Sequence, residues 1–240
     1  MIQKDNAIIL SIIKYKDKNL IIRAFTEKNG IKSFITTLSS ARKKGSSNNN
    51  YQIFSILEVV YQTNAKSGLH RIKESKNIHL LIDIRVNVYK SAITFLLAEI
   101  FNKSIQEEEK NVNLYTFLES QILLLNNCIG SFTNFHLYSI SQLTKQIGLC
   151  PVNKGRFLYF NINEGEFTTA IPTNSYYLET AEASLFQKLL DLPWEETRKI
   201  PMTGESRTAF LLQLLKYYKY HLPGFKRPKS LDVLIETFNM

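Results

Sequence analysis

The residues with the clearest chemistry form a basic segment in the first third of the chain. Arg42, Lys43 and Lys44 are consecutive in a polar stretch that also contains a glycine and several serines and asparagines. Lysine and arginine displace counterions from a phosphate backbone, and small neighbours allow close approach. Arg23 and Lys32, on strands predicted either side of a turn, extend this basic surface. These five residues are predicted to bind a nucleic-acid backbone, with simple solubility as the alternative reading of the loop.

The distribution of charge also favours a polyanionic partner. The formal net charge is +9, from 30 Lys and Arg against 21 Asp and Glu. Residues 1–80 hold 14 of the basic and 5 of the acidic residues, whereas residues 81–240 hold 16 of each. Positive charge clustered in this way is typical of nucleic-acid binding. An anionic membrane surface is the competing partner, but it favours a basic amphipathic helix, and this region alternates like strands.

The sequence lacks the motifs of catalysis and cofactor binding. It has no phosphate-binding glycine loop, no dinucleotide fingerprint and no nucleophile elbow. The four histidines have no metal-ligand spacing to one another or to Cys128 and Cys150. For His136, near the apolar face of a predicted helix, a structural role is favoured over ligand binding. We expect a non-enzyme without metal or other cofactor, and a hydrolase acting on nucleic acid is kept as an alternative.

The sequence also bears on the cellular compartment of the protein and on its association with membranes. No stretch approaches the ~18 uncharged apolar residues that a membrane span needs. The N-terminus lacks the apolar run of a signal peptide. Two cysteines in 240 residues do not make the disulfide scaffold of a secreted protein, so both thiols are expected to be reduced and mostly buried. A cytoplasmic protein is expected.

Short strands must position the basic residues. Apolar runs rich in β-branched residues alternate with turn residues, and Asn29-Gly30 between two runs is a strong hairpin signal. The expected strands are residues 7–13, 20–26, 31–35, 54–61 and 69–74. Five short strands suit a small closed barrel, for which the OB-fold is the leading candidate. Phe25 and Phe34 could stack on bases, but core packing is the favoured role for both.

After about residue 83 the apolar period becomes helical. The first helix should bury Val86, Tyr89 and Ile93 on one face with the leucines that follow. Further helices are expected near residues 114–125, 131–147, 180–191, 205–221 and 230–238. The fold class is α+β: a five-stranded OB-type barrel, residues 1–80, followed by an α-helical domain, residues 81–240, with a small β-hairpin near 157–168.

The order of these features resembles the RecO family along essentially the whole chain. The first strand, the turn Glu27 to Gly30 and the basic loop look like that family's OB domain. The segment from Phe135 to Gly148-Leu149-Cys150-Pro151 is similar to its central helix and glycine-x-x-proline end. The tail from Tyr217 to Phe225 looks like the form found in Bacteroidetes-type members.

The resemblance implies a non-enzymatic recombination mediator. Such proteins bind single- and double-stranded DNA, anneal complementary strands and engage the acidic C-terminal tail of single-stranded-DNA-binding protein. With RecR they help RecA replace that protein on the strand, which implies a bacterial, nucleoid-associated location. Many members carry a four-cysteine zinc site after the glycine-x-x-proline segment. Here residues 151–155 contain no cysteine, so no zinc site is expected, and the hairpin should replace it by packing alone.

A partner tail that is acidic with an apolar end needs an apolar pocket with a cationic rim. The candidates for that site lie on two predicted helices of the second part of the chain: Tyr138, Lys145, Arg207, Lys216 and Tyr217. Core packing or surface exposure is the alternative for each of them. The alternative for the whole protein is an OB-fold RNA-binding protein, which would use the same basic surface but read the 2′-hydroxyl.

Overall fold

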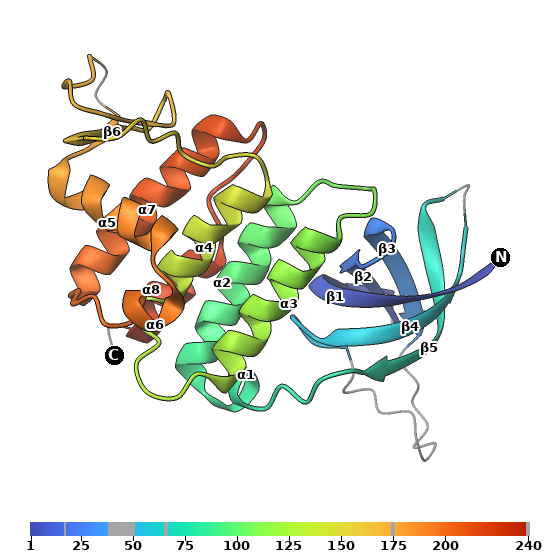
Figure 1. The fold of residues 1–240 in the computed structure, drawn as a ribbon. Coiled ribbons are helices and arrows are strands. Elements are labelled where there is room, and N and C mark those ends of the chain that lie inside the picture. Colours follow the sequence, from blue (N-terminus) through green and yellow to red (C-terminus); the bar gives the residue numbers. More distant parts are fainter. Residues whose placement is uncertain (17, 38–50, 65–66, 174–175, 239–240) are drawn as a thin grey trace. The chain divides into compact units, whose positions relative to one another are not determined.

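Strands at the N-terminus close into a barrel in the order β1-β2-β3-β5-β4 (Figure 1). The computed structural model describes residues 1–16, 18–37, 51–64, 67–173 and 176–238. The strands are β1 (Ile2–Tyr15), β2 (Asn19–Thr26), β3 (Gly30–Thr37), β4 (Ile56–Gln62) and β5 (Leu69–Asn77). The predicted five-stranded OB-type barrel is therefore confirmed.

The long first strand closes the barrel because it pairs with two neighbours. β1 is antiparallel to β2 on one side and to β4 on the other. Its register with β2 shifts between Ile9 and Ser11, and an irregularity of this kind lets a strand bend from one partner to the next. The last seam is parallel, with Ser33 of β3 opposite Leu69 of β5. At the predicted hairpin, Gly30 has a φ of 64°, which glycine adopts without steric penalty.

The barrel interior is filled by apolar side chains from all five strands. Phe34 packs edge-on against Tyr61, with ring centroids 5.1 Å apart. Phe25 and Phe34 are both buried, so core packing is their role and neither ring is open to a base. The buried core comprises Ala7, Ile9, Leu20, Ile22, Ala24, Phe34, Leu57, Val59, Tyr61 and Ile72.

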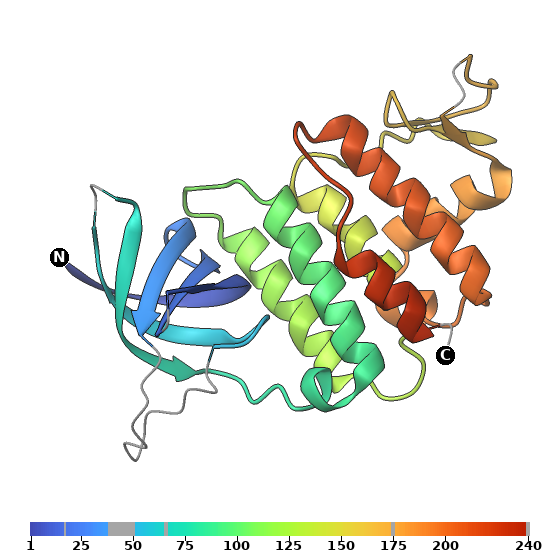
Figure 2. The ribbon, with the colours of Figure 1, turned by 180° about the vertical axis from the view of Figure 1, so that it is seen from behind.

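Three helices follow the barrel: α1 (Asp83–Val86), α2 (Val88–Ser104) and α3 (Val112–Asn127). The side chain of Asn87 caps α2 by accepting hydrogen bonds from the backbone N–H groups of Tyr89 and Lys90. The expectation that Val86 and Tyr89 share a buried face with Ile93 was wrong. Val86 is 75% exposed because it belongs to α1 and α2 begins only after it, and Tyr89, in the first turn of α2, is 39% exposed. α2 and α3 lie side by side in both views (Figures 1 and 2).

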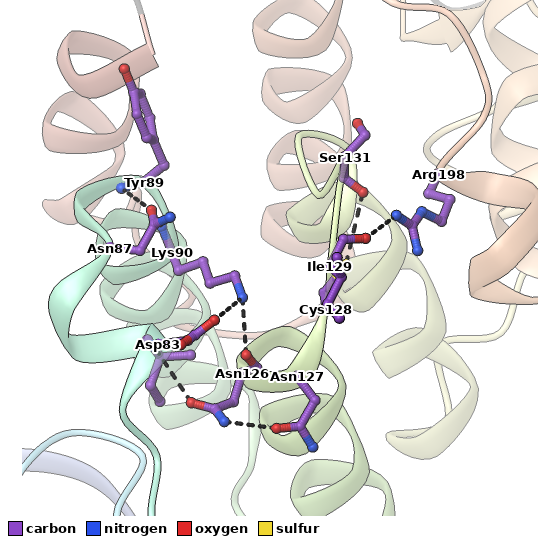
Figure 3. A network of polar contacts seen from close by, with 11 residues as sticks. Asp83, Asn87, Tyr89, Lys90, Asn126, Asn127, Cys128, Ile129, Ser131 and Arg198 are labelled. Atoms are coloured by element: carbon purple, nitrogen blue, oxygen red, sulfur yellow. Dashed lines mark hydrogen bonds and ion pairs between the residues drawn. The ribbon is translucent and has the colours of Figure 1, made fainter.

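A buried lysine connects these three helices (Figure 3). The Lys90 ammonium donates to Asp83 Oδ2 over 3.0 Å and to the carbonyl of Asn126 over 2.9 Å. Lys90 is only 2% exposed, so its charge depends on these oxygens for the solvation that water would otherwise provide. The contacts join the start of α2 to α1 and to the end of α3.

The remaining elements are helical around a small sheet. They are α4 (Phe135–Gln146), β6 (Tyr159–Asn161), β7 (Glu166–Thr168), β8 (Tyr177–Leu178), α5 (Thr180–Asp191), α6 (Trp194–Thr197), α7 (Gly204–His221) and α8 (Ser230–Phe238). The predicted hairpin is present as β6 and β7, and β8 adds a third strand beside β6. His136 on α4 is buried, and this burial lowers its pKa to about 3, so the ring is neutral.

The chain divides into two compact units, residues Met1–Asn127 and Cys128–Met240. Unit 1 holds the barrel with α1, α2 and α3, and unit 2 holds α4 to α8 with the small sheet. The expected domains, 1–80 and 81–240, follow the change from strands to helices and stay a prediction. Within the described residues, no helix is both long and apolar enough to cross a membrane. Cys128 is buried as expected, whereas Cys150 is exposed.

Candidate nucleic-acid interface

Arg23 lies on β2, and its guanidinium turns toward the end of α2. It donates to the backbone carbonyl of Asn102, to Asn102 Oδ1 over 2.6 Å and to the carbonyl of Ile105 over 3.2 Å. Partial burial lowers the pKa of Arg23, while Glu108 opposes that shift. Three of the five guanidinium N–H groups that were predicted to bind phosphate therefore have acceptors within the protein.

Lys32, predicted with Arg23 as a DNA contact, lies on β3 close to the same connection. Its ammonium is 3.5 Å from the carbonyl of Glu108, at the surface. The neighbouring Ile31 donates its N–H to the carbonyl of Glu107 over 2.8 Å. The β2–β3 turn thus contacts the segment between α2 and α3. The Lys32 ammonium lies at the surface beside this contact.

The predicted contacts Arg42, Lys43 and Lys44 lie outside the described residues. The points where their segment leaves and rejoins the barrel are described. Thr37 ends β3 opposite Asn19 of β2, and Thr37 Oγ1 donates to Asn19 Oδ1 over 3.0 Å. The hydroxyl of Tyr51, after the segment, lies 2.8 Å from Ser75 Oγ on β5. The roles of the three residues stay a prediction.

The structure adds a basic turn that the sequence analysis did not select. Lys14 at the end of β1 and Lys16 and Lys18 in the β1–β2 turn are exposed, and we call these three residues the lysine turn. Tyr15 between them is 43% exposed, and the Lys16 ammonium lies 5.4 Å from the centre of its ring. Because Asn19 pairs with Thr37, this turn adjoins the point where the basic segment begins. The available signal was three lysines at alternate positions, separated by Tyr15 and Asp17.

A pocket of about 340 Å³ opens in unit 1 beside this end of the barrel. Ile12 of β1 and Ile53 contribute apolar atoms, together with Ile84 of α1. Gln52 and Arg85 also line it, as do Ser91, Thr94 and Phe95 of α2. This pocket was not predicted from the sequence. The available signal was Phe95, an aromatic residue outside the apolar stripe of its helix.

The five tail candidates lie in unit 2, and most of their polar groups already have partners. Lys145 donates to the carbonyl of Leu190, and Arg207 to that of Met202 over 2.7 Å. Lys216 lies over the ring of Tyr176, 5.3 Å from its centre. Tyr217 is buried in the core, and its hydroxyl donates to the carbonyl of Leu149 over 2.8 Å. Tyr138 is half-buried, 5.6 Å from the Trp194 ring.

A second pocket, of about 420 Å³, lies between α5 and α7 in unit 2. Leu185, Met202 and Phe210 give it an apolar lining, and Lys188 and Glu182 add one charge of each sign. Arg207 lies beside it through its bond to the Met202 carbonyl. Among contacts between described residues, Arg207 is the one candidate of the five that is bonded to a residue lining this pocket. Lys188 was not among the residues selected from the sequence.

Comparisons with known proteins cover nearly the whole chain. A family model for "Recombination protein O N terminal" matches residues 1–81, and one for "Recombination protein O C terminal" matches residues 85–232. A "DNA repair protein RecO" of Flavobacterium johnsoniae is 38% identical, over 98% of this chain and 99% of that protein. Proteins of the same name from Flavobacterium psychrophilum and Bacteroides fragilis are 37% and 33% identical, over 98% and 100% of this chain and 99% and 100% of theirs.

Proposed function

The chain belongs to the RecO family of DNA repair and recombination proteins, and on that premise we propose that its barrel binds single- and double-stranded DNA. The observation that carries the proposal is the basic end of the barrel. The lysine turn of β1–β2 adjoins the start of the segment that contains residues 42–44. The exposed lysines of this turn release counterions from phosphates on binding, whatever the base sequence, and Arg42, Lys43 and Lys44 are proposed to act in the same way.

The proposed role is that of a recombination mediator without catalytic residues. The protein anneals complementary strands and, with RecR, helps RecA onto DNA coated by single-stranded-DNA-binding protein in the bacterial cytoplasm. Relatives that are named DNA repair proteins favour this role over the RNA-binding alternative. The mechanism needs neither metal nor nucleotide, because electrostatic attraction concentrates both strands on one basic surface.

Strand binding and annealing test the proposal directly. Labelled single-stranded DNA should bind the full chain, and unlabelled DNA should compete more strongly than RNA of the same sequence. Complementary DNA strands should anneal faster with the protein present, in EDTA and without ATP. Preference for RNA, or annealing abolished by EDTA alone, would contradict the proposal.

For the acidic tail of single-stranded-DNA-binding protein, we propose the pocket between α5 and α7. Its apolar lining suits the tail's apolar end, while Lys188 at the pocket and Arg207 beside it supply positive charge. The tail and DNA would then bind different units of the chain.

The tail site is tested with the full chain, because a cut at residue 81 would separate α1–α3 from the barrel of their own unit. A labelled tail peptide should bind the full chain, and Lys188→Glu should weaken that binding about tenfold or more. Lys199→Glu is the matched control, an exposed lysine of the same unit that does not line the pocket. Equal effects of both variants would refute this site, and competition of DNA with the peptide would move the tail to the barrel.

A further inference from the structure

The pocket beside the barrel in unit 1 combines an exposed aromatic ring with polar groups. Phe95 is 50% exposed, although Ile93, Leu96 and Leu97 on the same helix are fully buried. Single exposed apolar residues are common on protein surfaces, so exposure alone indicates nothing. The residues around the ring distinguish Phe95 from such single exposed residues. Ser91, Thr94 and Phe95 share one face of α2 by their spacing, and all three line the pocket.

Three polar side chains accompany the ring. Arg85 Nη2 donates to Ser55 Oγ over 3.0 Å, which holds the guanidinium in place, and partial burial lowers its pKa. Gln52 is exposed and presents an amide. Thr94 is 4% exposed, and its hydroxyl has no hydrogen-bond partner within the described part of the chain. A buried hydroxyl without a partner loses its hydration, and a ligand that bonds to it removes that loss.

The backbone that carries Gln52 is held in a strained conformation. Phe54 has a φ of +63° and is buried, a conformation that is costly for a bulky residue. Its N–H donates to the carbonyl of Ile9 over 2.8 Å, and the carbonyl of Ser55 accepts from the Ile9 N–H over 3.0 Å. Strain that the surroundings maintain is found most often at functional sites. Here it holds Gln52 next to Ser55, the anchor of Arg85: the Gln52 N–H donates to Ser55 Oγ over 3.3 Å, and the Ser55 N–H donates to the Gln52 carbonyl over 3.0 Å.

The charge around the pocket and its position on the barrel indicate which kind of ligand it binds. Unit 1 carries 18 Lys and Arg against 11 Asp and Glu. Ile12 of the pocket precedes the lysine turn by two residues, and Gln52 follows the segment containing residues 42–44. Side chains two residues apart on a strand share a face, so a DNA strand whose phosphates contact Lys14 passes the mouth of the pocket at Ile12. An acidic peptide would find the same charge, but a flat ring with hydrogen-bonding edges fits the phenyl face and converging polar groups better.

We propose that this pocket is a base-stacking subsite for one unpaired nucleotide of single-stranded DNA. The base stacks on Phe95, and its edge bonds to the side chains of Arg85, Gln52 and Thr94. A base within a duplex has its faces and pairing edge covered, so it cannot enter without leaving the stack. The subsite, which rests on the proposed DNA binding, therefore adds affinity for single strands alone.

The test compares three ligands of equal length: oligo(dT), an abasic strand with the same number of phosphates, and a duplex. Phe95→Ala should weaken oligo(dT) binding about tenfold, which corresponds to ~1.4 kcal/mol and lies within the range for base–aromatic stacking. The slope of log K against log salt should stay unchanged, because no phosphate contact is lost. Binding of the abasic strand and of the duplex should also stay unchanged.

Two further variants separate stacking from folding. Phe95→Leu keeps an apolar side chain but removes the aromatic face, so it should reproduce the loss. The tryptophan introduced by Phe95→Trp should retain affinity, and its fluorescence should be quenched by oligo(dT) but not by the abasic strand. The native tryptophan, Trp194, is buried in unit 2 and gives a constant background. Tyr89→Ala is the control, because Tyr89 is an exposed aromatic residue on the same helix that does not line the pocket.

The outcomes distinguish the subsite from the function on which it rests. If wild-type protein binds oligo(dT) and Phe95→Ala binds it equally well, the subsite is refuted and DNA binding stands. The subsite is also refuted if Tyr89→Ala gives the same loss, or if Phe95→Ala weakens binding of the abasic strand to the same extent. If the wild-type protein binds none of the three ligands, both the proposed function and the subsite are wrong.

Discussion

Arg23 should act as a cap on the end of a helix rather than as a phosphate contact. Its guanidinium donates to the carbonyls of Asn102 and Ile105 and to the side chain of Asn102. These carbonyls belong to the last turn of α2 and the residue that follows it. The final carbonyls of a helix lack intrahelical donors and carry partial negative charge. A cation held at this point donates hydrogen bonds to these carbonyls and interacts favourably with their partial negative charge.

The size of the effect follows from these contacts. A net hydrogen bond to a charged group contributes about 1.5–3 kcal/mol, and a cation at a helix C-terminus adds about 0.3–1 kcal/mol. The contacts share one half-buried side chain, so their contributions are not additive. Arg23→Ala should therefore lower the free energy of unfolding by about 3 kcal/mol. In a chain of this size that corresponds to a fall in Tm of roughly 6–12 °C.

Thermal unfolding and salt-dependent DNA binding together distinguish the two roles. If Arg23 caps α2, Arg23→Ala should lower Tm and leave the slope of log K against log salt unchanged. Loss of a phosphate contact would instead flatten that slope by ~0.7 for single-stranded DNA. Lys32→Ala is the matched control and should change Tm little, because its side chain makes one long surface contact. An unchanged Tm with a flattened slope for Arg23→Ala would refute the capping role.

Three further predictions concern the basic segment, a glycine and a histidine. Triple alanine substitution of residues 42–44 should weaken binding about equally on all DNA sequences and flatten the salt slope by ~0.7 for each lost contact; unchanged affinity would remove the segment from the interface. Gly30→Ala should lower Tm far more than Gly68→Ala in thermal melts. Both glycines have a φ of +64°, but a Cβ at Gly30 would lie 2.5 Å from the carbonyl oxygen of Glu109, while none of the described atoms lies within 4 Å at Gly68. An equal fall in Tm for both variants would mean that the close packing at Gly30 does not contribute to the loss of stability. Burial lowers the pKa of His136 to about 3. Below pH 6.5 the side chain is therefore protonated in the unfolded chain but stays neutral in the folded chain. The stability due to neutral His136 is therefore complete above pH 6.5 and is lost as the pH falls toward 3, by about 2 kcal/mol at pH 5. Urea unfolding of His136→Phe should show a correspondingly smaller loss between pH 8 and pH 5, and parallel profiles would contradict this.

Features that depend on neighbours in the chain were readable from the sequence. β-Branched runs and the Asn29-Gly30 turn predicted strands that β1 to β5 confirm, because alternation and turn chemistry act over a few residues. The helical period likewise located α3, α4, α5 and α7. The concentration of positive charge in residues 1–80 needed only the positions of lysine and arginine. The family resemblance followed from the order of these local features.

Side-chain roles that depend on distant contacts could not be read in this way. Arg23 was predicted as a DNA contact, yet its acceptor Asn102 lies 79 residues away. Tyr217 was a candidate for the tail site, but its hydroxyl bonds to a carbonyl 68 residues earlier. Apolar periodicity predicts which face of a helix is buried. It does not predict which segment packs on that face, because this depends on contacts between residues that are far apart in the sequence.

The sequence by itself determined the strands, most helices, the basic first third of the chain and the family. Tertiary structure decided which basic groups remain open to a ligand. It joined Ile12, Gln52 and Phe95 in one pocket, although they come from three separate segments. The physical reason is that secondary structure reflects local backbone preferences, whereas a site is made of contacts that exist only once the barrel has closed and helices have packed on it.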